Sequence, residues 1–296
     1  LNLSRKSGGL AIELSGESID LRPFLDKQKS PTSDSTLSTS KTSDTLVATI
    51  GRATGYNKES LSSVILKLAT SKGKVTSVNF SAVTRSGQAV VMKRDSAAGT
   101  IDITAGDAGA LARFTDIYRN MNGGLLNITL RARDADSWRG SIDIHNFALV
   151  NEQRIKSIVS ARASEDGRSL SDAVNTDIDT SSQKFRRGFA RILLDGKVVR
   201  VENGIVRGDQ IGATFQGTVR DIRGDTNMTG TFMPAYGLNS LFGQLPLIGT
   251  ILGNGRDRGL LGITFKLEGP FDKPKLTVNP LSLIAPGVFR NIFEFE

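Results

Sequence analysis

The residue types that most often carry out catalysis are scarce in this chain. It contains a single histidine, His145, and no cysteine. Acid–base and metal sites normally recruit several imidazoles or pair one with a nucleophile, while disulfides, thiolate metal sites and thiol redox chemistry need cysteine. His145 follows Ile144 in the run SIDIHNF. On a strand it would lie on the same face as the polar residues Ser141 and Asp143, which predicts a solvated position.

Two pairs of closely spaced carboxylates are the remaining candidates for chemistry, Asp134 with Asp136 and Asp177 with Asp179. They could serve a glycosidase or a calcium site, but the full spacing of an EF-hand loop is absent and aspartate is common in turns. The glycine-rich run GTILGNGR at 249–256 lacks the Lys-Ser/Thr of a phosphate loop. We therefore predict a protein that is not an enzyme and uses no cofactor or metal.

Length and charge limit the classes of protein to which the chain can belong. The 296 residues include 38 Lys and Arg against 30 Asp and Glu, a net charge of +8, and their mean hydropathy is -0.16. A chain of this size can build a real core, and no apolar stretch reaches the roughly 18 to 20 residues of a membrane-spanning helix. Arg and Asp alternate along most of the chain instead of forming a basic stripe, so we expect no nucleic-acid partner. We expect one domain over residues 1–296.

Short strands are the elements that would position any site. Apolar residues alternate with polar ones in runs that end at Gly, Asn, Asp or Ser, which is the period of a sheet with one solvated face. The clearest runs are 10–14, 75–80, 101–103, 126–130, 142–144, 198–201, 215–219 and 276–278. They predict a mainly β fold, an antiparallel sheet of roughly 15 strands that is too long for a closed sandwich.

Three segments have helical character and interrupt the strands. In the first, residues 106–118, Asp107 can cap the helix, and apolar residues share one face. The other two, 153–163 and 167–175, are short and need a sheet to lie on. Residues 27–44 are rich in Ser, Thr, Lys and Asp with one apolar residue, which predicts a mobile loop within the domain.

The last part of the chain, residues 234–296, is predicted to form a cap region. Its apolar stretch at 238–252 is too short and too often interrupted by Gly and Pro to span a bilayer. Near the C-terminus, apolar residues repeat at helical spacing and predict a terminal amphipathic helix that contacts a membrane or partner, or closes one end of the core. These residues are Val288, Phe289, Ile292 and Phe293.

Several short motifs stand out in the last part of the chain and upstream of it. The C-terminal motifs are PAYGLN at 234–239, LPLIG at 245–249, GLLGI at 259–263, GP at 269–270, VNPLS at 278–282 and APG at 285–287, and the upstream ones are SIDLRPFL at 18–25, DAGA at 107–110 and NGGL at 122–125. Together they resemble the C-terminal region of AsmA-like proteins, and most of all the YhdP-type envelope proteins of Gram-negative bacteria. The serine-rich segment at 27–44 has no place in this resemblance.

The resemblance implies a bridge-like lipid transporter. In that family an N-terminal helix anchors the protein in the inner membrane, and a long, elongated, twisted β-sheet with an open groove crosses the periplasm and guides phospholipid acyl chains toward the outer membrane. We would then expect a periplasmic location, phospholipid acyl chains as partners and a membrane surface or outer-membrane partner at the C-terminal end. The chain begins at Leu1 without a signal or anchor, so we expect it to be a piece of a longer protein.

Candidate residues for the wall of such a groove are apolar residues at alternate strand positions. They are Leu126, Ile128, Leu130, Ile142, Ile144, Ile192, Leu194, Phe215 and Val219. The same residues would equally line an ordinary closed core, which alternation alone does not distinguish from a groove. Two other functions stay open: a structural or interaction module that influences outer-membrane protein assembly without carrying lipid, and, less favoured, a polysaccharide-active β enzyme.

Overall fold

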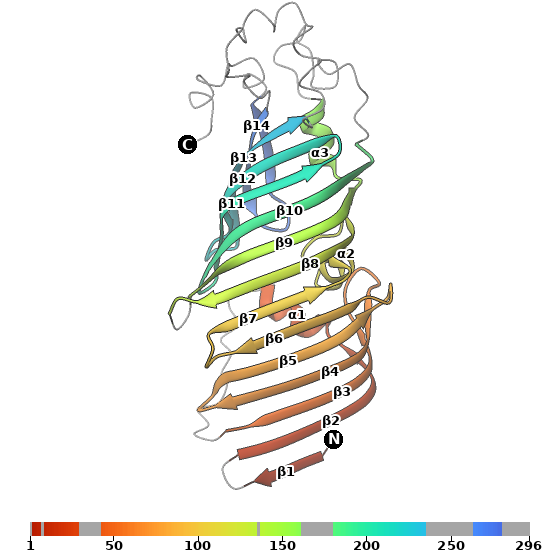
Figure 1. Ribbon diagram of the computed structural model, residues 1–296, viewed down its shortest axis with the longest axis vertical. Coiled ribbons are helices and arrows are strands. Elements are labelled where there is room, and N and C mark those ends of the chain that lie inside the picture. The colour runs from red at the N-terminus through yellow and green to blue at the C-terminus, as the bar shows by residue number, and fades with distance from the viewer. Residues whose placement is uncertain are drawn as a thin grey trace, which may run out of the picture. The chain divides into compact units, whose positions relative to one another are not determined.

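The computed structural model describes residues 2–6, 9–29, 43–134, 137–160, 180–234 and 263–279 (Figure 1). Contacts within the chain divide it into two compact units. The first comprises Leu1–Phe147 with Leu193–Gly196, and the second comprises Ala148–Ile192 with Lys197–Glu296. The single domain over 1–296 stays a prediction.

Strands dominate the described residues and follow one another in a single open sheet, in the order of the chain, with β1 and β15 at its edges. The strands up to β9 are β1 (Asn2–Lys6), β2 (Gly9–Asp20), β3 (Thr45–Thr54), β4 (Ser60–Ser71), β5 (Lys74–Thr84), β6 (Ala89–Asp95), β7 (Thr100–Ala105), β8 (Met121–Ala132) and β9 (Ser137–Val150). The others are β10 (Ser182–Asp195), β11 (Val198–Gly208), β12 (Ile211–Arg220), β13 (Asp225–Pro234), β14 (Ile263–Pro270) and β15 (Lys275–Asn279). The predicted mainly β fold with an open sheet is confirmed.

The sheet is mixed, so the prediction of a purely antiparallel sheet is wrong at one place. Strands β2 and β3 pair in parallel, with Leu14 opposite Ala48, while the other pairs whose register is described are antiparallel. Parallel neighbours need a crossover connection, because the chain has to return to the end from which it started. The helix α1 (Arg22–Lys29) lies in that connection and was not predicted.

The predicted loop at 27–44 is correspondingly too long at both ends. Residues 27–29 belong to α1, and Asp44 is held between two strands. Its backbone exchanges hydrogen bonds with Thr70, and its Oδ1 accepts one from the backbone N of Leu10 at 2.9 Å. The carboxylate thus provides an acceptor for a backbone N–H of β2. Residues 30–42 lie outside the described residues.

Two further helices lie within predicted segments, and the first is shorter than predicted, since it ends at Phe114 and not at residue 118. Asp107 caps α2 (Ala108–Phe114), its Oδ1 accepting a hydrogen bond from the backbone N of Ala110 at 2.8 Å, as the sequence predicts. Helix α3 (Gln153–Val159) begins where predicted and buries Ile155, Ile158 and Val159. The third predicted helix, 167–175, lies outside the described residues.

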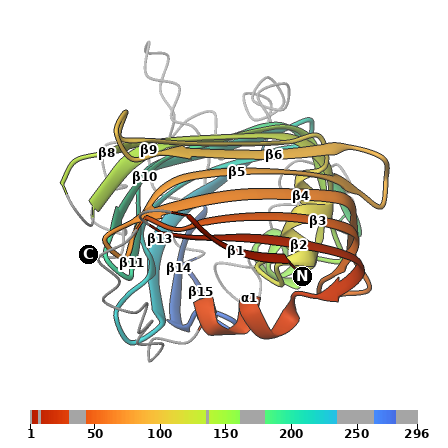
Figure 2. The same ribbon diagram turned by 90° about the horizontal axis from the view of Figure 1, so that it is seen from below.

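The core of the first unit lies between one face of its sheet and the helices α1 and α2. Its buried cluster includes Ile50, Val90 and Leu126 from the strands and Phe114 from α2, and Leu25 of α1 packs against it. Figure 2 shows these strands curving, with the two helices on the inner side of the curve. The helices therefore cover part of the apolar face, and the strands present their other face outward.

Two predictions for the C-terminal region can be compared with the structure only in part. Within the predicted cap region, β14 and β15 continue the sheet. Residues 235–262 and 280–296 lie outside the described residues, so the rest of the cap region and the terminal amphipathic helix with Val288, Phe289, Ile292 and Phe293 stay predictions. Among the residues that are described, no helix is both long and apolar enough to cross a bilayer.

Candidate functional site

A continuous apolar row crosses one face of the first unit. Seven neighbouring strands, β2 to β8, each place one apolar residue in register with the next. The residues, in strand order, are Leu14, Ala48, Leu66, Phe80, Met92, Ile103 and Ile128. All except Ala48 remain partly accessible to solvent. We call these seven residues the central row.

Burial of this face decreases away from the helices. The row on one side of the central row, with Ala82, Val90, Ala105 and Leu126 in register, is buried in the cluster that includes α2. The row on the other side contains Ile12, Leu46, Leu68, Val78, Arg94, Ile101 and Leu130. All of these except Leu130 are partly accessible. The helices thus cover one margin of the apolar face and leave the rest of it incompletely covered.

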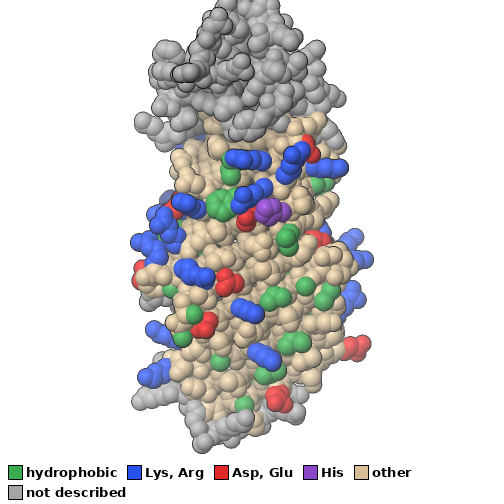
Figure 3. Space-filling view, viewed as in Figure 1, with side chains coloured by type: hydrophobic (Ala, Val, Ile, Leu, Met, Phe, Trp, Pro, Cys, Tyr) green, Lys and Arg blue, Asp and Glu red, His purple; other side chains and the backbone are tan. Residues whose placement is uncertain are grey.

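The opposite face of the same strands is polar. Residues one position along from the central row are Glu13, Val47, Lys67, Asn79, Lys93, Asp102 and Thr129, also in register. Figure 3, which views the sheet from the side away from α1, shows Lys, Arg, Asp and Glu side chains scattered over this face, with separate apolar side chains between them. The alternation therefore separates a solvated outer face from an apolar inner one.

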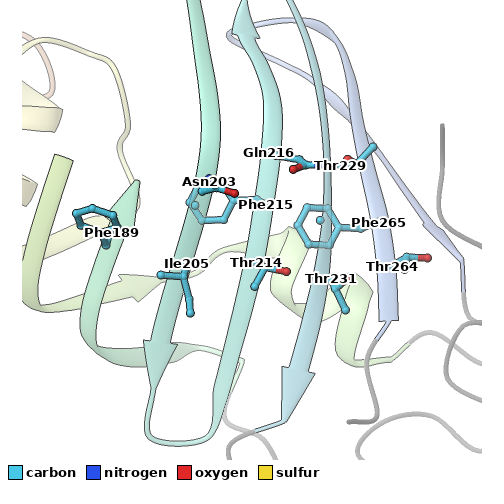
Figure 4. Close-up of a pocket in the computed structure, with 12 residues that line it drawn as sticks. Phe189, Asn203, Ile205, Thr214, Phe215, Gln216, Thr229, Thr231, Thr264 and Phe265 are labelled. Atoms are coloured by element: carbon cyan, nitrogen blue, oxygen red, sulfur yellow. The ribbon is translucent and has the colours of Figure 1, made fainter. Parts of the chain in front are cut away.

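The second unit contains a cavity of about 400 Å³ on strands β10 to β14 (Figure 4). Three aromatic rings line it, Phe189, Phe215 and Phe265, together with threonines and backbone. Its volume falls in the range of roughly 300–1,000 Å³ that is typical of small-molecule sites.

Glycine and phenylalanine alternate from strand to strand across the four strands β11 to β14, and these residues line the cavity. Gly204, Phe215, Gly230 and Phe265 lie opposite one another on four successive strands. A Cβ added to Gly204 would lie 2.2 Å from Cε2 of Phe215, and one added to Gly230 would lie 2.4 Å from Cζ of Phe265. Each ring therefore covers the glycine beside it, an arrangement in which an aromatic side chain compensates for the missing one.

The predicted groove residues fall into several environments. Leu126, Leu130 and Ile192 are buried, whereas Ile128, Ile142 and Ile144 are partly accessible and pack against the core cluster of the first unit. Leu194 and Val219 are half-buried. Phe215 lines the cavity of the second unit. Their role in binding lipid stays a prediction.

Most of the central row was not predicted, because the groove candidates were chosen only from Leu126 onward. Phe80 and Ile103 carry the same alternating signal, but their relation to one another and to Met92 depends on strand register, which the sequence does not show. In the second unit, Phe265 was also missed. Its pairing with a glycine in the preceding strand would have been the signal.

His145 and the aspartate pairs are the ionisable residues that the sequence singled out. His145 Nε2 lies 3.1 Å from Asp143 Oδ1, and both side chains are partly exposed on β9, as the sequence predicts. Asp134 accepts hydrogen bonds from the backbone N and the Oγ of Ser137 and thus closes a turn. Asp136, Asp177 and Asp179 lie outside the described residues. Nowhere in the described residues do three or more potential metal ligands cluster.

Comparison of the chain with protein-family models, curated proteins and solved structures finds no significant match. The resemblance to AsmA-like proteins accordingly stays a prediction.

Proposed function

We propose that this chain binds phospholipid acyl chains along the apolar face of its sheet and, without catalysing a reaction, transports phospholipid between the inner and outer membranes. In this proposal it acts in the periplasm as part of an envelope protein anchored in the inner membrane. The observation that carries the proposal is the central row, seven apolar residues in register on an open sheet whose helices cover one margin.

The physical argument concerns what such a face can hold. Each methylene that leaves water is stabilised by about 0.8 kcal/mol, so an acyl chain laid on the face gains free energy in proportion to its length. Aliphatic and aromatic side chains make contacts without directional bonds, which allows a bound chain to move along the face. The partly exposed side chains of Phe80, Met92 and Ile103 offer such contacts.

The alternative is a structural or interaction module that affects outer-membrane protein assembly without carrying lipid. An apolar face can also be an interface for another protein. The two functions differ in what the purified protein retains, because a lipid carrier should co-purify with phospholipid and a scaffold should not.

Site-specific photocrosslinking tests the proposal. A photoreactive amino acid is placed at Ile103, in the central row, and separately at Thr104, the next residue on β7 and exposed on the opposite face. We expect phospholipid adducts from position 103 and none above background from position 104, detected by mass spectrometry after expression in cells. Adducts of proteins alone at position 103 would favour the scaffold, and equal lipid labelling at both positions would contradict the proposal.

A charge introduced on either face of the sheet gives a second measurement. Met92→Glu places a carboxylate in the central row, and Lys93→Glu introduces the same group on the exposed, opposite face. Native mass spectrometry should show less co-purified phospholipid with Met92→Glu and an unchanged amount with Lys93→Glu, provided both variants fold by circular dichroism. Met92→Gln, which adds no charge, is the milder variant if Met92→Glu does not fold.

A further inference from the structure

The apolar face of the first unit contains one charged residue among the rows with described register on β4 to β8. Arg94 lies in register between Val78 and Ile101. The acidic residues nearby on β6 and β7, Asp95 and Asp102, each follow an inner-face residue directly and therefore point to the outer face. An arginine at this position is therefore not explained by the alternation that produces the sheet.

Part of the Arg94 side chain is buried without a hydrogen-bond partner among the described residues. Its Nε is the one side-chain nitrogen or oxygen there that is buried without a hydrogen bond. Buried polar groups are nearly always hydrogen-bonded, because an unpaired one keeps the full cost of losing its water. The guanidinium remains charged at any physiological pH, so this cost is not relieved by loss of a proton.

Trp138 supplies the one described interaction of the guanidinium. Cζ of Arg94 lies 5.4 Å from the centroid of the Trp138 ring, within the reach of a cation–π interaction. This contact joins side chains of β6 and β9 and restrains the guanidinium, but an aromatic ring accepts no conventional hydrogen bond from Nε. Nε of Arg94 therefore has no hydrogen-bond acceptor among the described residues, and the residue as a whole is partly accessible to a ligand.

We propose that Arg94, restrained by Trp138, binds the phosphate of a phospholipid whose acyl chains lie on the adjoining central row. A guanidinium matches a phosphate through two parallel N–H···O bonds, and the neighbours of Arg94 in the central row, Met92 and Ile103, are apolar. The charge and the apolar row together select an anionic amphiphile instead of a wholly apolar molecule. This inference rests on the proposed function and adds a fixed site for the headgroup.

The single tryptophan of the chain makes the site directly measurable. Bromine quenches indole fluorescence only at contact distance, so phospholipid with brominated acyl chains reports occupancy beside Trp138. The probes are brominated phosphatidylglycerol, brominated diacylglycerol, which lacks the phosphate, and a brominated fatty acid, which carries a carboxylate. We expect wild type to bind the phosphatidylglycerol at least about tenfold more tightly than the diacylglycerol, since charge-assisted hydrogen bonds are strong.

Substitutions at Arg94 and at its neighbour separate the headgroup site from the apolar face. Arg94→Gln and Arg94→Met should lose about tenfold in affinity for the phosphatidylglycerol and retain the affinity for diacylglycerol, and Arg94→Lys should lie between. Lys93→Gln, on the outer face of the same strand, should bind all probes as wild type does. Arg94→Gln and Arg94→Met are both used because they differ in polarity, so that a folding defect in one of them does not decide the result.

Each remaining outcome counts against a defined part of the proposal. If the brominated lipids quench wild type and Arg94→Gln equally, the headgroup site is wrong and the proposed function survives. If no brominated lipid quenches the fluorescence of wild type, this face does not bind lipid, and both the proposed function and the headgroup site are contradicted. If glycerol 3-phosphate competes as well as phosphatidylglycerol, the source is a soluble phosphate and not a lipid, and preference for the fatty acid would overturn phosphate as the bound group.

Discussion

Phe215 lies directly opposite Gly204 on neighbouring strands, and its ring occupies the space where a side chain on residue 204 would lie. The relationship is steric, since the three atoms nearest to a Cβ added at residue 204 are all ring carbons of Phe215, at 2.2 to 2.6 Å. A ring placed in this way forms part of the cavity wall in the second unit. The glycine and the ring therefore constitute one structural feature.

Substitution of Gly204 by alanine should displace the Phe215 ring and destabilise the protein. We expect the free energy of unfolding to fall by about 1–3 kcal/mol, the usual cost of inserting a methyl group into a packed site. Gly204→Ala combined with Phe215→Ala should cost less than the sum of the single changes, because the clash is absent in the double variant. Gly16→Ala is the control, since its Cβ would meet Ile50 Cδ1 at an ordinary 3.5 Å. Additive effects in chemical denaturation would contradict this account.

Loss of the α2 cap should weaken the cover of the apolar face. Asp107 is buried, and its two oxygens accept hydrogen bonds from the backbone N of Ala110 and the Oγ of Ser86. Asp107→Ala should lower the free energy of unfolding by about 1–2 kcal/mol and increase binding of an apolar fluorescent dye. Asp107→Asn, which retains an acceptor, should have a smaller effect.

The control for that experiment is Asp102→Ala. Asp102 lies on the outer face, where its Oδ2 is 3.8 Å from an exposed Arg131 nitrogen. Exposed pairs contribute about 0–1 kcal/mol, so dye binding should not change. An equal increase in dye binding for both variants would show that the cap has no particular part in covering the face.

Removal of the unpaired charge at Arg94 should stabilise the protein. In Arg94→Met the buried Nε that lacks a partner is replaced by apolar atoms of similar length, and the free energy of unfolding should rise by about 1–3 kcal/mol because the desolvation cost disappears. Lys93→Met, on the exposed outer face, should change it little. A destabilised Arg94→Met, measured in urea, would mean that the cation–π contact with Trp138 outweighs the cost of burial.

Two ion pairs of similar length should differ in their contribution to stability. The Arg113–Glu59 pair, at 2.8 Å, has side chains 20% and 12% exposed, whereas the Arg186–Asp209 pair, at 2.7 Å, has side chains 80% and 52% exposed. Glu59→Gln should cost about 1.5–3 kcal/mol, the range for hydrogen bonds to charged groups, and Asp209→Asn about 0–1 kcal/mol. Equal costs in thermal denaturation would contradict the role assigned to burial.

The turn between β12 and β13 should respond to acid. Hydrogen bonds from the backbone N–H of Asp225 and of Arg223 hold the pKa of Asp221 below its usual 3.8. This favourable contribution is complete above the pKa of the unfolded chain and is lost as the pH falls through the lower folded value. NMR titration should place the Asp221 midpoint below 3.8, and Asp221→Asn should remove the loss of amide protection in the turn at low pH, measured relative to intrinsic exchange rates. A midpoint that is not lowered would contradict the assigned hydrogen bonds.

Local alternation allowed much of the sheet to be predicted, since side chains on a strand point alternately to its two faces. Leu126, Ile128 and Leu130 were assigned to one face from spacing alone, and the register places them opposite Ala105, Ile103 and Ile101 on that face. In contrast, the run AVVMKRD at 89–95 has apolar residues at consecutive positions, so its two faces cannot be separated from the pattern. Arg94 was missed for this reason.

The sequence by itself determined a strand-rich chain with one polar and one apolar face, the Asp107 cap and the solvated strand position of His145, because periodicity and capping act over a few residues. Tertiary structure decided the parallel pairing of β2 with β3, the contact of Arg94 with Trp138 and the position of Phe215 over Gly204. These relationships depend on strand order and register across the sheet, which bring together residues that are far apart in the chain and that no local pattern relates.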